Sequence, residues 1–257
     1  MKLFKNIFAR FWAFWGLITF VGTFLIIFIP SMIAYLIPGR KGQIYFLQVA
    51  KCWMFMWLTL IGCRLKIRGR ENFKNGKTYI VIYNHNAFLD APISAPYVPG
   101  ANKTIAKKTF TKIPLFGWFY AKGSVLVDRK NDKSRSSSFD EMRRVLQMGY
   151  HMCIYPEGTR NRTNMPLKTF YDGAFRLSLA TGNEIIPAVI SGTKRAMPIH
   201  KKFYLLPLPI ELQYFPAISP IGKDLEKLKS EARQVMWNAY VSNPLNDIDP
   251  SAISFAE

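Results

Sequence analysis

The sequence predicts an α/β fold with a mostly parallel sheet flanked by helices, preceded by an N-terminal membrane-seated helical hairpin. Three observations carry this prediction. The 257 residues are enough for one α/β domain with a full core, an uncharged run of 29 residues extends from Phe11 to Gly39, and short strand-like runs alternate with helical segments after Arg70. We therefore assign residues 1–63 to membrane-associated helices and residues 64–257 to an α/β domain.

The composition is strongly basic and also rich in apolar residues. There are 35 Lys plus Arg against 16 Asp plus Glu, which gives a net charge of +19, and 49% of the residues are hydrophobic. That hydrophobic content excludes a disordered basic tail protein, and the charge implies an anionic partner: nucleic acid, a membrane surface or an acidic substrate. The cysteines, Cys52, Cys63 and Cys153, are too few for a disulfide scaffold, and no CxxC or HExxH pattern predicts a metal site.

The uncharged run is long enough for a membrane helix. A signal peptide is the alternative, because Lys2, Lys5 and Arg10 could form a positively charged n-region. However, the apolar stretch is too long for a signal peptide, and no small-x-small cleavage site follows it. We therefore expect this segment to be retained and to sit in lipid.

A second apolar segment, from Gln43 to Cys63, raises the choice between a span and a hairpin. Basic groups flank the apolar segments on all three sides, and a simple span would carry the middle group across the bilayer, against the positive-inside tendency. A hairpin in one leaflet, broken at Pro30 and Pro38, keeps all three groups at one anionic surface. We favour the hairpin, with the α/β domain on the cytoplasmic face of the membrane. The basic groups are Lys2, Lys5 and Arg10; Arg40 and Lys41; and Arg64, Lys66, Arg68 and Arg70.

The α/β domain contains short runs of β-branched and aromatic residues, which predict strands, and segments with helical spacing between them. The first expected helix begins behind a serine cap, and the second stops at Gly182. Because such alternation favours a parallel sheet, we expect active groups at the carboxyl ends of the strands. The expected strands are Leu65–Arg68, Thr78–Tyr83, Ser124–Val127, Met152–Tyr155 and Glu184–Ile190, and the expected helices are Ser136–Met148, Gly173–Ala180 and Asp224–Val241.

The segment Asn84–Asp90 directly follows an apolar strand candidate and contains a histidine and an aspartate five residues apart. On a continuous helix that spacing separates them by about 140°, so they meet only if His85 lies in a loop and Asp90 in the first turn of a helix. Asp90 could then fix the tautomer of His85 and leave its other ring nitrogen as a base. A helix N-terminus with a capping asparagine and a first-turn acid is the structural alternative.

Two further strand exits carry charged residues. Glu157-Gly158-Thr159-Arg160 follows one strand candidate, and Arg129 follows another. A glycine at such a turn lets the backbone approach a ligand closely, and arginine suits bidentate phosphate binding. Taken singly, these features also fit a turn with a surface ion pair and a basic residue in a solvated loop.

In combination these segments resemble the glycerolipid acyltransferases, the 1-acyl-sn-glycerol-3-phosphate acyltransferase family. The resemblance covers roughly Gly69 to Thr193, with Leu126 where the family often has Phe. The N-terminal apolar pair also resembles the family's membrane-seated two-helix element. The matching blocks are Asn84–Asp90 (HxxxxD), Gly123–Arg129 (the arginine block), Glu157–Arg160 (EGTR), Ile185–Val189 (the proline-containing block), and Ala106–Lys108 with Ile113–Gly117 between the first two.

The resemblance implies that residues 64–257 form an acyltransferase domain that moves a fatty acyl group from a thioester donor to the sn-2 hydroxyl of lysophosphatidate. It implies acyl-CoA or an acyl carrier protein thioester as cosubstrate, with no cofactor and no metal, and an anionic membrane surface as partner. The implied roles are His85 as base, Asp90 as its orienting group, Lys107, Arg129 and Arg160 as phosphate-binding residues, and Glu157 as a glycerol contact, with Gly158 and Thr159 also in the substrate-binding block.

Three other functions are consistent with parts of the sequence. Another acceptor, glycerol 3-phosphate or a different lysophospholipid, fits the same blocks. A non-catalytic lipid-binding module is disfavoured because His85, Asp90, Glu157 and Arg160 are all present. A nucleic-acid-binding membrane protein is disfavoured because the charge lies beside apolar segments and not in a recognition helix, so we expect no nucleic-acid partner.

Overall fold

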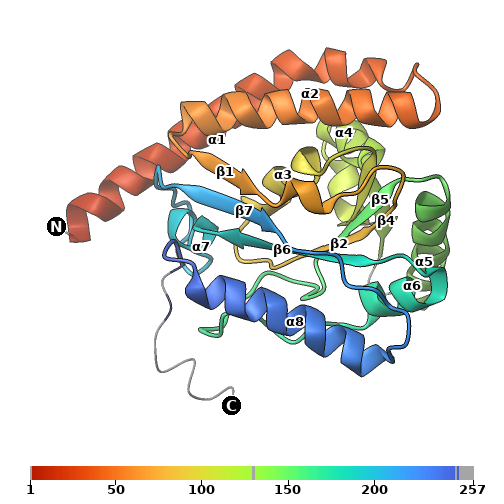
Figure 1. Cartoon of the computed structure of the whole chain (residues 1–257). Helices are drawn as coiled ribbons and strands as arrows, with labels where there is room; N and C mark the ends of the chain where they lie inside the picture. The colour runs from red at the N-terminus through yellow and green to blue at the C-terminus, as the bar shows by residue number, and fades with distance from the viewer. Residues whose placement is uncertain (1, 129–130, 247, 249–257) are drawn as a thin grey trace.

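The computed structural model describes residues 2–128, 131–246 and 248, and its centre is one seven-stranded sheet (Figure 1). The strand order is β1-β7-β6-β2-β5-β3-β4. Strands β6, β2, β5, β3 and β4 are mutually parallel, whereas β7 runs antiparallel to β6 and pairs in parallel with β1. The strands are β1 Leu65–Arg68, β2 Ile80–Tyr83, β3 Asn102–Lys107, β4 Ser124–Val127, β5 His151–Ile154, β6 Ile185–Ser191 and β7 Ile210–Tyr214.

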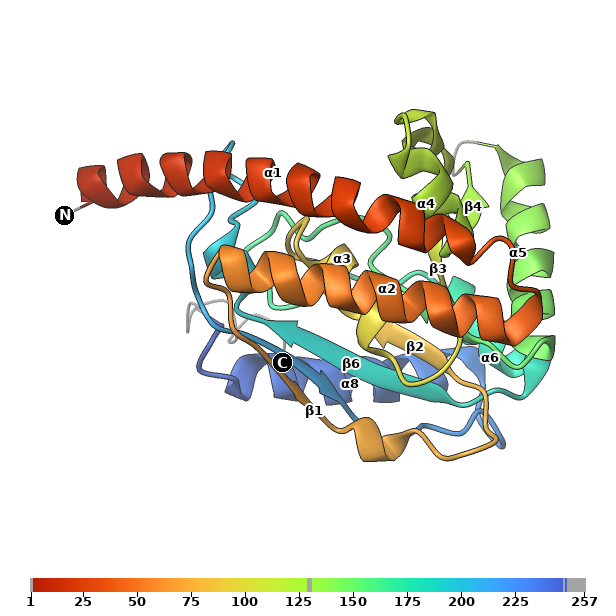
Figure 2. The same ribbon diagram turned by 90° about the horizontal axis from the view of Figure 1, so that it is seen from above.

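Helices cover both faces of the sheet and bury two separate hydrophobic clusters. On one face, α1 and α2 lie side by side and pack with α3 and α4 over the sheet (Figures 1 and 2). On the other face, α5, α6 and α8 bury the second cluster. The helices are α1 Lys2–Ile33, α2 Gly39–Leu60, α3 Asp90–Ser94, α4 Phe116–Lys122, α5 Asp132–Gln147, α6 Gly173–Thr181, α7 Thr193–Ala196 and α8 Leu225–Ser242, with 3₁₀ turns η1 Arg70–Asn72, η2 Ala95–Tyr97 and η3 Lys108–Lys112.

The predicted fold class is confirmed: the sheet is mostly parallel, it is flanked by helices, and a long apolar helix begins the chain. All five expected strands exist, within a residue or two at their ends. The sequence analysis missed β3 and β7. In β7 only every second residue is hydrophobic, and proline-rich segments surround it, so it lacks the continuous apolar run that marks the central strands. The helix expected from Ser136 begins earlier, because the Asn131 side chain caps it by accepting a hydrogen bond from the Ser134 N–H at 3.1 Å.

The N-terminal apolar segments form the expected hairpin, but Pro30 does not break it. Pro30 lies in the last turn of α1, and the helix continues to Ile33. A proline there removes one hydrogen bond, to the Ile26 carbonyl, and only three residues of helix follow it. The chain turns after Ile33, and α2 begins directly after Pro38, whose extended backbone precedes the helix. The second helix therefore starts four residues before the expected apolar segment at Gln43.

Tryptophan side chains hold the two helices together. The indole N–H of Trp12 donates to the Ile61 carbonyl, and that of Trp57 donates to the Gly16 carbonyl, both at 2.9 Å. Buried indole groups need such partners, because an unpaired polar atom in an apolar layer is costly. Trp57 also belongs to the hydrophobic cluster that contains sheet residues, so the hairpin and the sheet share one core.

We expect Gly42→Ala to destabilise the hairpin. Gly42 lies in the first turn of α2, and an added Cβ would overlap the carbonyl oxygen of Ile37 in the preceding turn. Overpacking of this kind costs about 1–3 kcal/mol, which lowers the melting temperature by about 2–4 °C per kcal/mol in a domain of this size. Gly22→Ala is the matched control. Gly22 lies within α1 with nothing near its added Cβ, so helix propensity should make that change neutral or stabilising. Thermal unfolding of the detergent-solubilised variants measures both, and equal melting temperatures would contradict the packing argument.

Candidate active site

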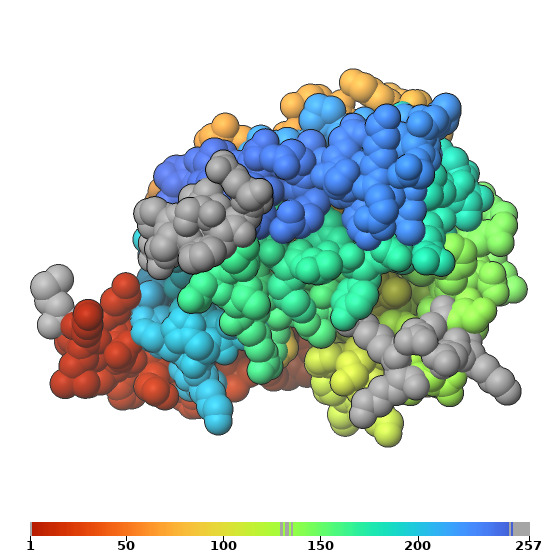
Figure 3. All heavy atoms as spheres, turned by 90° about the horizontal axis from the view of Figure 1, so that it is seen from below, coloured from red at the N-terminus to blue at the C-terminus, as the bar shows by residue number. Residues whose placement is uncertain are grey.

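The candidate site lies where β2, β5 and β6 end. β2 is the middle strand of these three and pairs in parallel with both neighbours, so their carboxyl ends reach the same edge. The segments that follow them therefore meet. Seen from below, the segment 155–172 after β5 (green) lies beside the segment 193–209 after β6 (cyan), with α8 (blue) next to both (Figure 3).

Asn84, the first residue after β2, fixes the start of the loop that carries the histidine. Its amide oxygen accepts from the Ile190 N–H at 2.7 Å, and its amide nitrogen donates to the Ile190 carbonyl at 2.9 Å. The side chain thus makes the pair of bonds that a backbone residue would make to β6. Asn84 is fully buried, so the loop leaves the sheet from a rigid point.

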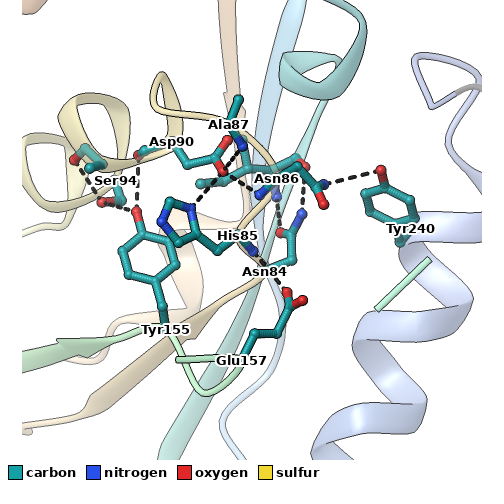
Figure 4. A network of polar contacts seen from close by, with 11 residues as sticks. Asn84, His85, Asn86, Ala87, Asp90, Ser94, Tyr155, Glu157 and Tyr240 are labelled. Carbon is teal, nitrogen blue, oxygen red and sulfur yellow. Dashed lines mark hydrogen bonds and ion pairs between the residues drawn. The ribbon is translucent and has the colours of Figure 1, made fainter. Parts of the chain in front are cut away.

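The structure brings His85 and Asp90 together (Figure 4). His85 lies in the loop, Asp90 is the first residue of α3, and Nδ1 of the ring is 2.9 Å from Oδ2 of the carboxylate. The geometry that the spacing required, with histidine in the loop and aspartate in the first helical turn, is therefore present. The His85 side chain is 19% exposed and that of Asp90 0%, so only the histidine can reach a ligand.

Asp90 is held by more than the histidine. The same oxygen, Oδ2, accepts hydrogen bonds from the backbone N–H groups of Asn86 at 2.5 Å and Ala87 at 2.7 Å. Because a carboxylate only accepts, Nδ1 of His85 must carry the proton that joins them. The neutral ring then presents Nε2 as an unprotonated acceptor, and no described residue forms a hydrogen bond to that atom. This is the arrangement of a general base.

Tyr155 supports the ring from one side. Its ring centroid lies 4.5 Å from that of His85, and its hydroxyl lies 2.8 Å from Ser94 Oγ and 3.0 Å from the Asp90 carbonyl oxygen. Burial raises the pKa of Tyr155 well above its usual value, so the hydroxyl stays protonated and donates. Tyr155 thereby connects the end of β5 to α3 and limits rotation of the histidine.

Glu157 occupies a different position from the one that the sequence analysis expected. Its side chain is fully buried, Oε1 accepts from the His85 backbone N–H at 2.8 Å, and Oε2 accepts from the Lys168 backbone N–H at 3.1 Å. Burial raises its pKa to about 7, against the lowering effect of those two hydrogen bonds. With both oxygens occupied and no exposed surface, the expected contact to glycerol does not fit this geometry.

The turn after Glu157 also contacts the backbone of His85, at its carbonyl group. Gly158 has φ +69°, a left-handed conformation that glycine adopts at no steric cost. The chain then returns so that the Asn161 N–H donates to the His85 carbonyl at 2.6 Å. Lys168 closes the turn by donating from Nζ to Thr159 Oγ1 at 2.8 Å. Both backbone polar groups of His85 are thus held by residues 157–161.

Arg160 lies over the loop with its guanidinium available. The guanidinium carbon is 3.4 Å from the ring centroid of Phe88, an exposed residue of the same loop as the histidine. Burial and then the nearby charge of Arg162 lower the pKa of Arg160. Among the described residues no carboxylate forms an ion pair with it. A stacked guanidinium with unpaired N–H groups is suited to bind an anion at its edge.

Of the other two expected phosphate-binding residues, Lys107 and Arg129, the structure describes only Lys107. Lys107 is exposed at the carboxyl end of β3, whose partner β5 ends at the same edge of the sheet. Arg129 lies outside the described residues, although β4 ends just before it, at Val127. In the described part of the chain, no group of three or more His, Cys, Asp or Glu side chains is arranged to hold a metal ion.

Several residues of the site were not expected from the sequence. Tyr155 directly follows β5, two residues before Glu157. Its position at the carboxyl end of a strand could therefore have indicated a site residue. Nothing in the sequence indicated Lys168 or Asn161, because their contacts to Glu157 Oε2 and to the His85 carbonyl are made by backbone N–H groups. Tyr240 in α8 also reaches the loop, and its position in the sequence gave no indication of that contact.

The comparisons with known proteins agree with this geometry. A family model described as "Acyltransferase" matches residues 64–191. The chain is 33% identical to a 1-acyl-sn-glycerol-3-phosphate acyltransferase of Cocos nucifera, over 72% of this chain and 57% of that protein, and 30% identical to one of Chlamydomonas reinhardtii, over 67% and 52%. The matches thus span little more than half the length of these relatives.

A solved structure has the same fold. The crystal structure of the 1-acyl-sn-glycerophosphate acyltransferase of Thermotoga maritima superposes with a TM-score of 0.76 at 22% identity, covering 94% of this chain and 97% of that one. The family match contains both the His85–Asp90 pair and the Glu157–Arg160 turn. The chain therefore belongs to the acyltransferase family.

Proposed function

We propose that this protein transfers a fatty acyl group from a thioester donor to the sn-2 hydroxyl of lysophosphatidate and so makes phosphatidate, the activity of a 1-acylglycerol-3-phosphate O-acyltransferase. The observation that carries the proposal is the His85–Asp90 pair, with Nε2 free to accept a proton, beside an Arg160 that no described carboxylate neutralises. The names of the relatives support the same acceptor.

The reaction needs one base and no enzyme nucleophile. Nε2 of His85 takes the proton from the acceptor hydroxyl as its oxygen attacks the carbonyl carbon of the thioester. The resulting tetrahedral intermediate collapses when the carbon–sulfur bond breaks, and the imidazolium returns the proton to the departing thiolate. Asp90 remains a hydrogen-bond acceptor throughout and stabilises the imidazolium between the two proton transfers.

Glu157 acts in this scheme as a positioning group. Its carboxylate holds the His85 N–H, while Asn161 holds the His85 carbonyl, so the backbone of the base cannot rotate when the ring changes charge. Gly158 and Thr159 lie in the turn that brings Glu157 and Asn161 to the two sides of His85. We propose that they also contact the substrate.

The phosphate of the acceptor binds to Arg160, together with Lys107 and Arg129 from the neighbouring strand ends. Arg160 extends from the turn beside the histidine, so a phosphate at its edge places a glycerol hydroxyl near the base. Phe88 holds the guanidinium plane by stacking, which keeps two N–H groups pointing the same way. Acyl-CoA or an acyl carrier protein thioester serves as cosubstrate, and the chemistry requires no further cofactor.

We also propose that α1 seats the protein in the cytoplasmic face of an anionic membrane. α1 is long and apolar enough to cross a bilayer, yet one of its faces packs along α2 and α4, so lipid could not surround it in a span. An in-plane position lets the opposite, exposed face enter one leaflet. That face consists of Leu3, Phe4, Ile7, Phe8, Phe11, Phe14, Trp15, Leu17, Ile18, Val21, Leu25, Ile26, Ile29 and Ile33.

The same apolar surface continues to the edge of the sheet that carries the site. β3 ends at this edge, and the chain leads directly into η3 and α4, where Ile113 and Trp118 are exposed. α4 in turn contacts α1, because the rings of Phe24 in α1 and Phe116 in α4 lie 5.7 Å apart. Just after α1, the Tyr35 hydroxyl also donates to the Trp118 carbonyl at 2.7 Å. Acceptor and product, both lipids, can therefore pass between the membrane and the site over a short path.

We expect His85→Ala to abolish transfer with little change in folding. General-base assistance is worth about 10²–10⁴-fold, so kcat should fall by at least that range. The side chain is partly exposed and its backbone contacts remain, so the melting temperature should stay close to that of the wild type. Asp90→Asn should lose less activity, because an amide oxygen can still accept hydrogen bonds. A larger loss for Asp90→Asn than for His85→Ala would reverse the two roles.

Arg160→Lys should weaken the use of lysophosphatidate by about tenfold or more, because lysine keeps the charge but lacks the planar pair of donors and the stack on Phe88. An acylglycerol without phosphate should be a poor acceptor for the wild type and show little further loss in the variant. Arg144→Lys on α5, where the arginine is exposed and pairs with Glu141, is the matched control. Equal losses with both acceptors would place the phosphate elsewhere.

The double change Leu25→Glu and Ile29→Glu should weaken membrane binding. Both side chains are exposed on the proposed lipid face of α1, and burying a carboxylate in lipid is costly. Ile221→Glu is the control, because Ile221 is 84% exposed and lies before α8, beside the residues that precede β2 and β6. Flotation with anionic vesicles should recover wild type and Ile221→Glu together and leave the double variant in solution. Equal flotation of all three proteins would show that α1 is not the membrane anchor.

A further inference from the structure

The side chain of Asn86 turns away from the histidine and toward the C-terminal helix. Its amide nitrogen donates to the hydroxyl oxygen of Tyr240 in α8 at 3.1 Å (Figure 4). Asn86 is 1% exposed and Tyr240 is 2% exposed, so the bond lies out of reach of water. The amide oxygen of Asn86 is also buried and has no hydrogen-bond partner among the described residues. Tyr240 is therefore the described residue that holds this side chain by a hydrogen bond.

Asn86 itself contacts the orienting carboxylate of the site. Its backbone N–H donates to Oδ2 of Asp90 at 2.5 Å, the same oxygen that accepts the hydrogen bond from His85 Nδ1–H. A displacement of Asn86 would therefore change one of the three hydrogen bonds on that oxygen. The contacts form a continuous path from Tyr240 through Asn86 and Asp90 to the histidine.

Tyr240 is well placed to act as a fixed support. Its ring belongs to the cluster that α8 buries against the sheet, together with Leu228, Ala232 and Met236 on the same helix face. Burial, and then the charges of Asp90 and Glu157, raise the pKa of Tyr240, so the hydroxyl stays protonated and neutral.

The end of α8 is tied to the same edge of the sheet by a second connection. The Asn246 amide nitrogen donates to the Tyr240 carbonyl and to Ser191 Oγ, both at 2.9 Å. Its amide oxygen accepts from the Gly192 N–H at 3.1 Å. Because Ser191 ends β6 beside β2, the helix is fastened to the strand next to the catalytic loop and cannot slide relative to it.

We propose that Tyr240 is a positioning residue for the His85–Asp90 pair and acts through Asn86. The inference rests on the proposed acyl transfer and extends it beyond residues 64–191, where the family match lies. α8 is then more than a cover for the sheet, because it sets the geometry of the loop that carries the base.

The experiment compares Tyr240→Phe with Tyr150→Phe in the full-length protein. Both tyrosines belong to the same hydrophobic cluster, and each change removes one hydroxyl, but Tyr150 precedes β5 at the opposite edge of the sheet. With lysophosphatidate and an acyl-CoA as substrates, Tyr240→Phe should lower kcat by about fivefold to tenfold, the effect of losing one hydrogen bond, and leave both KM values within about twofold. Tyr150→Phe should retain the wild-type kcat.

The path through Asn86 is tested by a double change. If Tyr240 acts only by holding Asn86, then adding Tyr240→Phe to Asn86→Ala should lower kcat little further than Asn86→Ala alone. Losses that multiply would mean that Tyr240 acts independently of Asn86. That result would overturn the proposed path.

Hydrogen exchange gives a readout that does not depend on the reaction. The amides of Asn86 and Ala87 both donate to Asp90, so loosening the loop should speed their exchange in Tyr240→Phe and not in Tyr150→Phe. Wild-type exchange together with wild-type kcat in Tyr240→Phe would refute the positioning role, as would equal kcat losses in the two phenylalanine variants. A wild type that acylates no lysophosphatidate would instead refute the proposed function, and exchange would still decide the role of Tyr240.

Discussion

Oδ2 of Asp90 accepts hydrogen bonds from the Nδ1–H of His85 and from two backbone N–H groups, while the side chain is fully shielded from water. A buried carboxylate is costly unless hydrogen bonds stabilise its charge, and here the loop supplies all three from the five residues before it. The loop must therefore adopt this one conformation to satisfy the acid. The orientation of the histidine ring follows from that requirement.

Backbone hydrogen bonds also stabilise the second buried carboxylate, that of Glu157. Backbone N–H groups of His85 and Lys168 occupy its oxygens, so neither buried acid needs an arginine as its counter-ion. The consequence is an uneven distribution of charge: both acids are buried and accept hydrogen bonds, although Oδ1 of Asp90 has no described partner, whereas Arg160 stays without an acidic partner in the described structure. A site built in this way presents positive charge to the solvent and an unprotonated nitrogen beside it, which suits an anionic molecule that carries a hydroxyl group.

The sequence predicted those parts of the molecule that depend on neighbouring residues. The strands next to the site are short, continuous apolar runs, and the pairing of His85 with Asp90 follows from one strand, one loop and one helix turn. Contacts between distant positions could not be predicted in this way. Glu157 reaches a backbone group 72 positions away, and Tyr240 reaches a side chain 154 positions away. Every residue except proline has a backbone N–H group, so the sequence does not show which of them has a side chain as its partner. The sequence therefore could not distinguish a Glu157 that contacts glycerol from a buried Glu157 that holds the His85 backbone.

The packing of α1 against the rest of the protein has a consequence for the membrane itself. On the proposed in-plane seating, the protein meets a single leaflet, because the inner side of the helix is occupied by tryptophan and phenylalanine contacts to α2 and α4. Every molecule of product would then enter the leaflet from which its acceptor came. Synthesis alone would expand that leaflet and leave the other unchanged, so balanced growth of the bilayer would require a separate process that moves lipid across it.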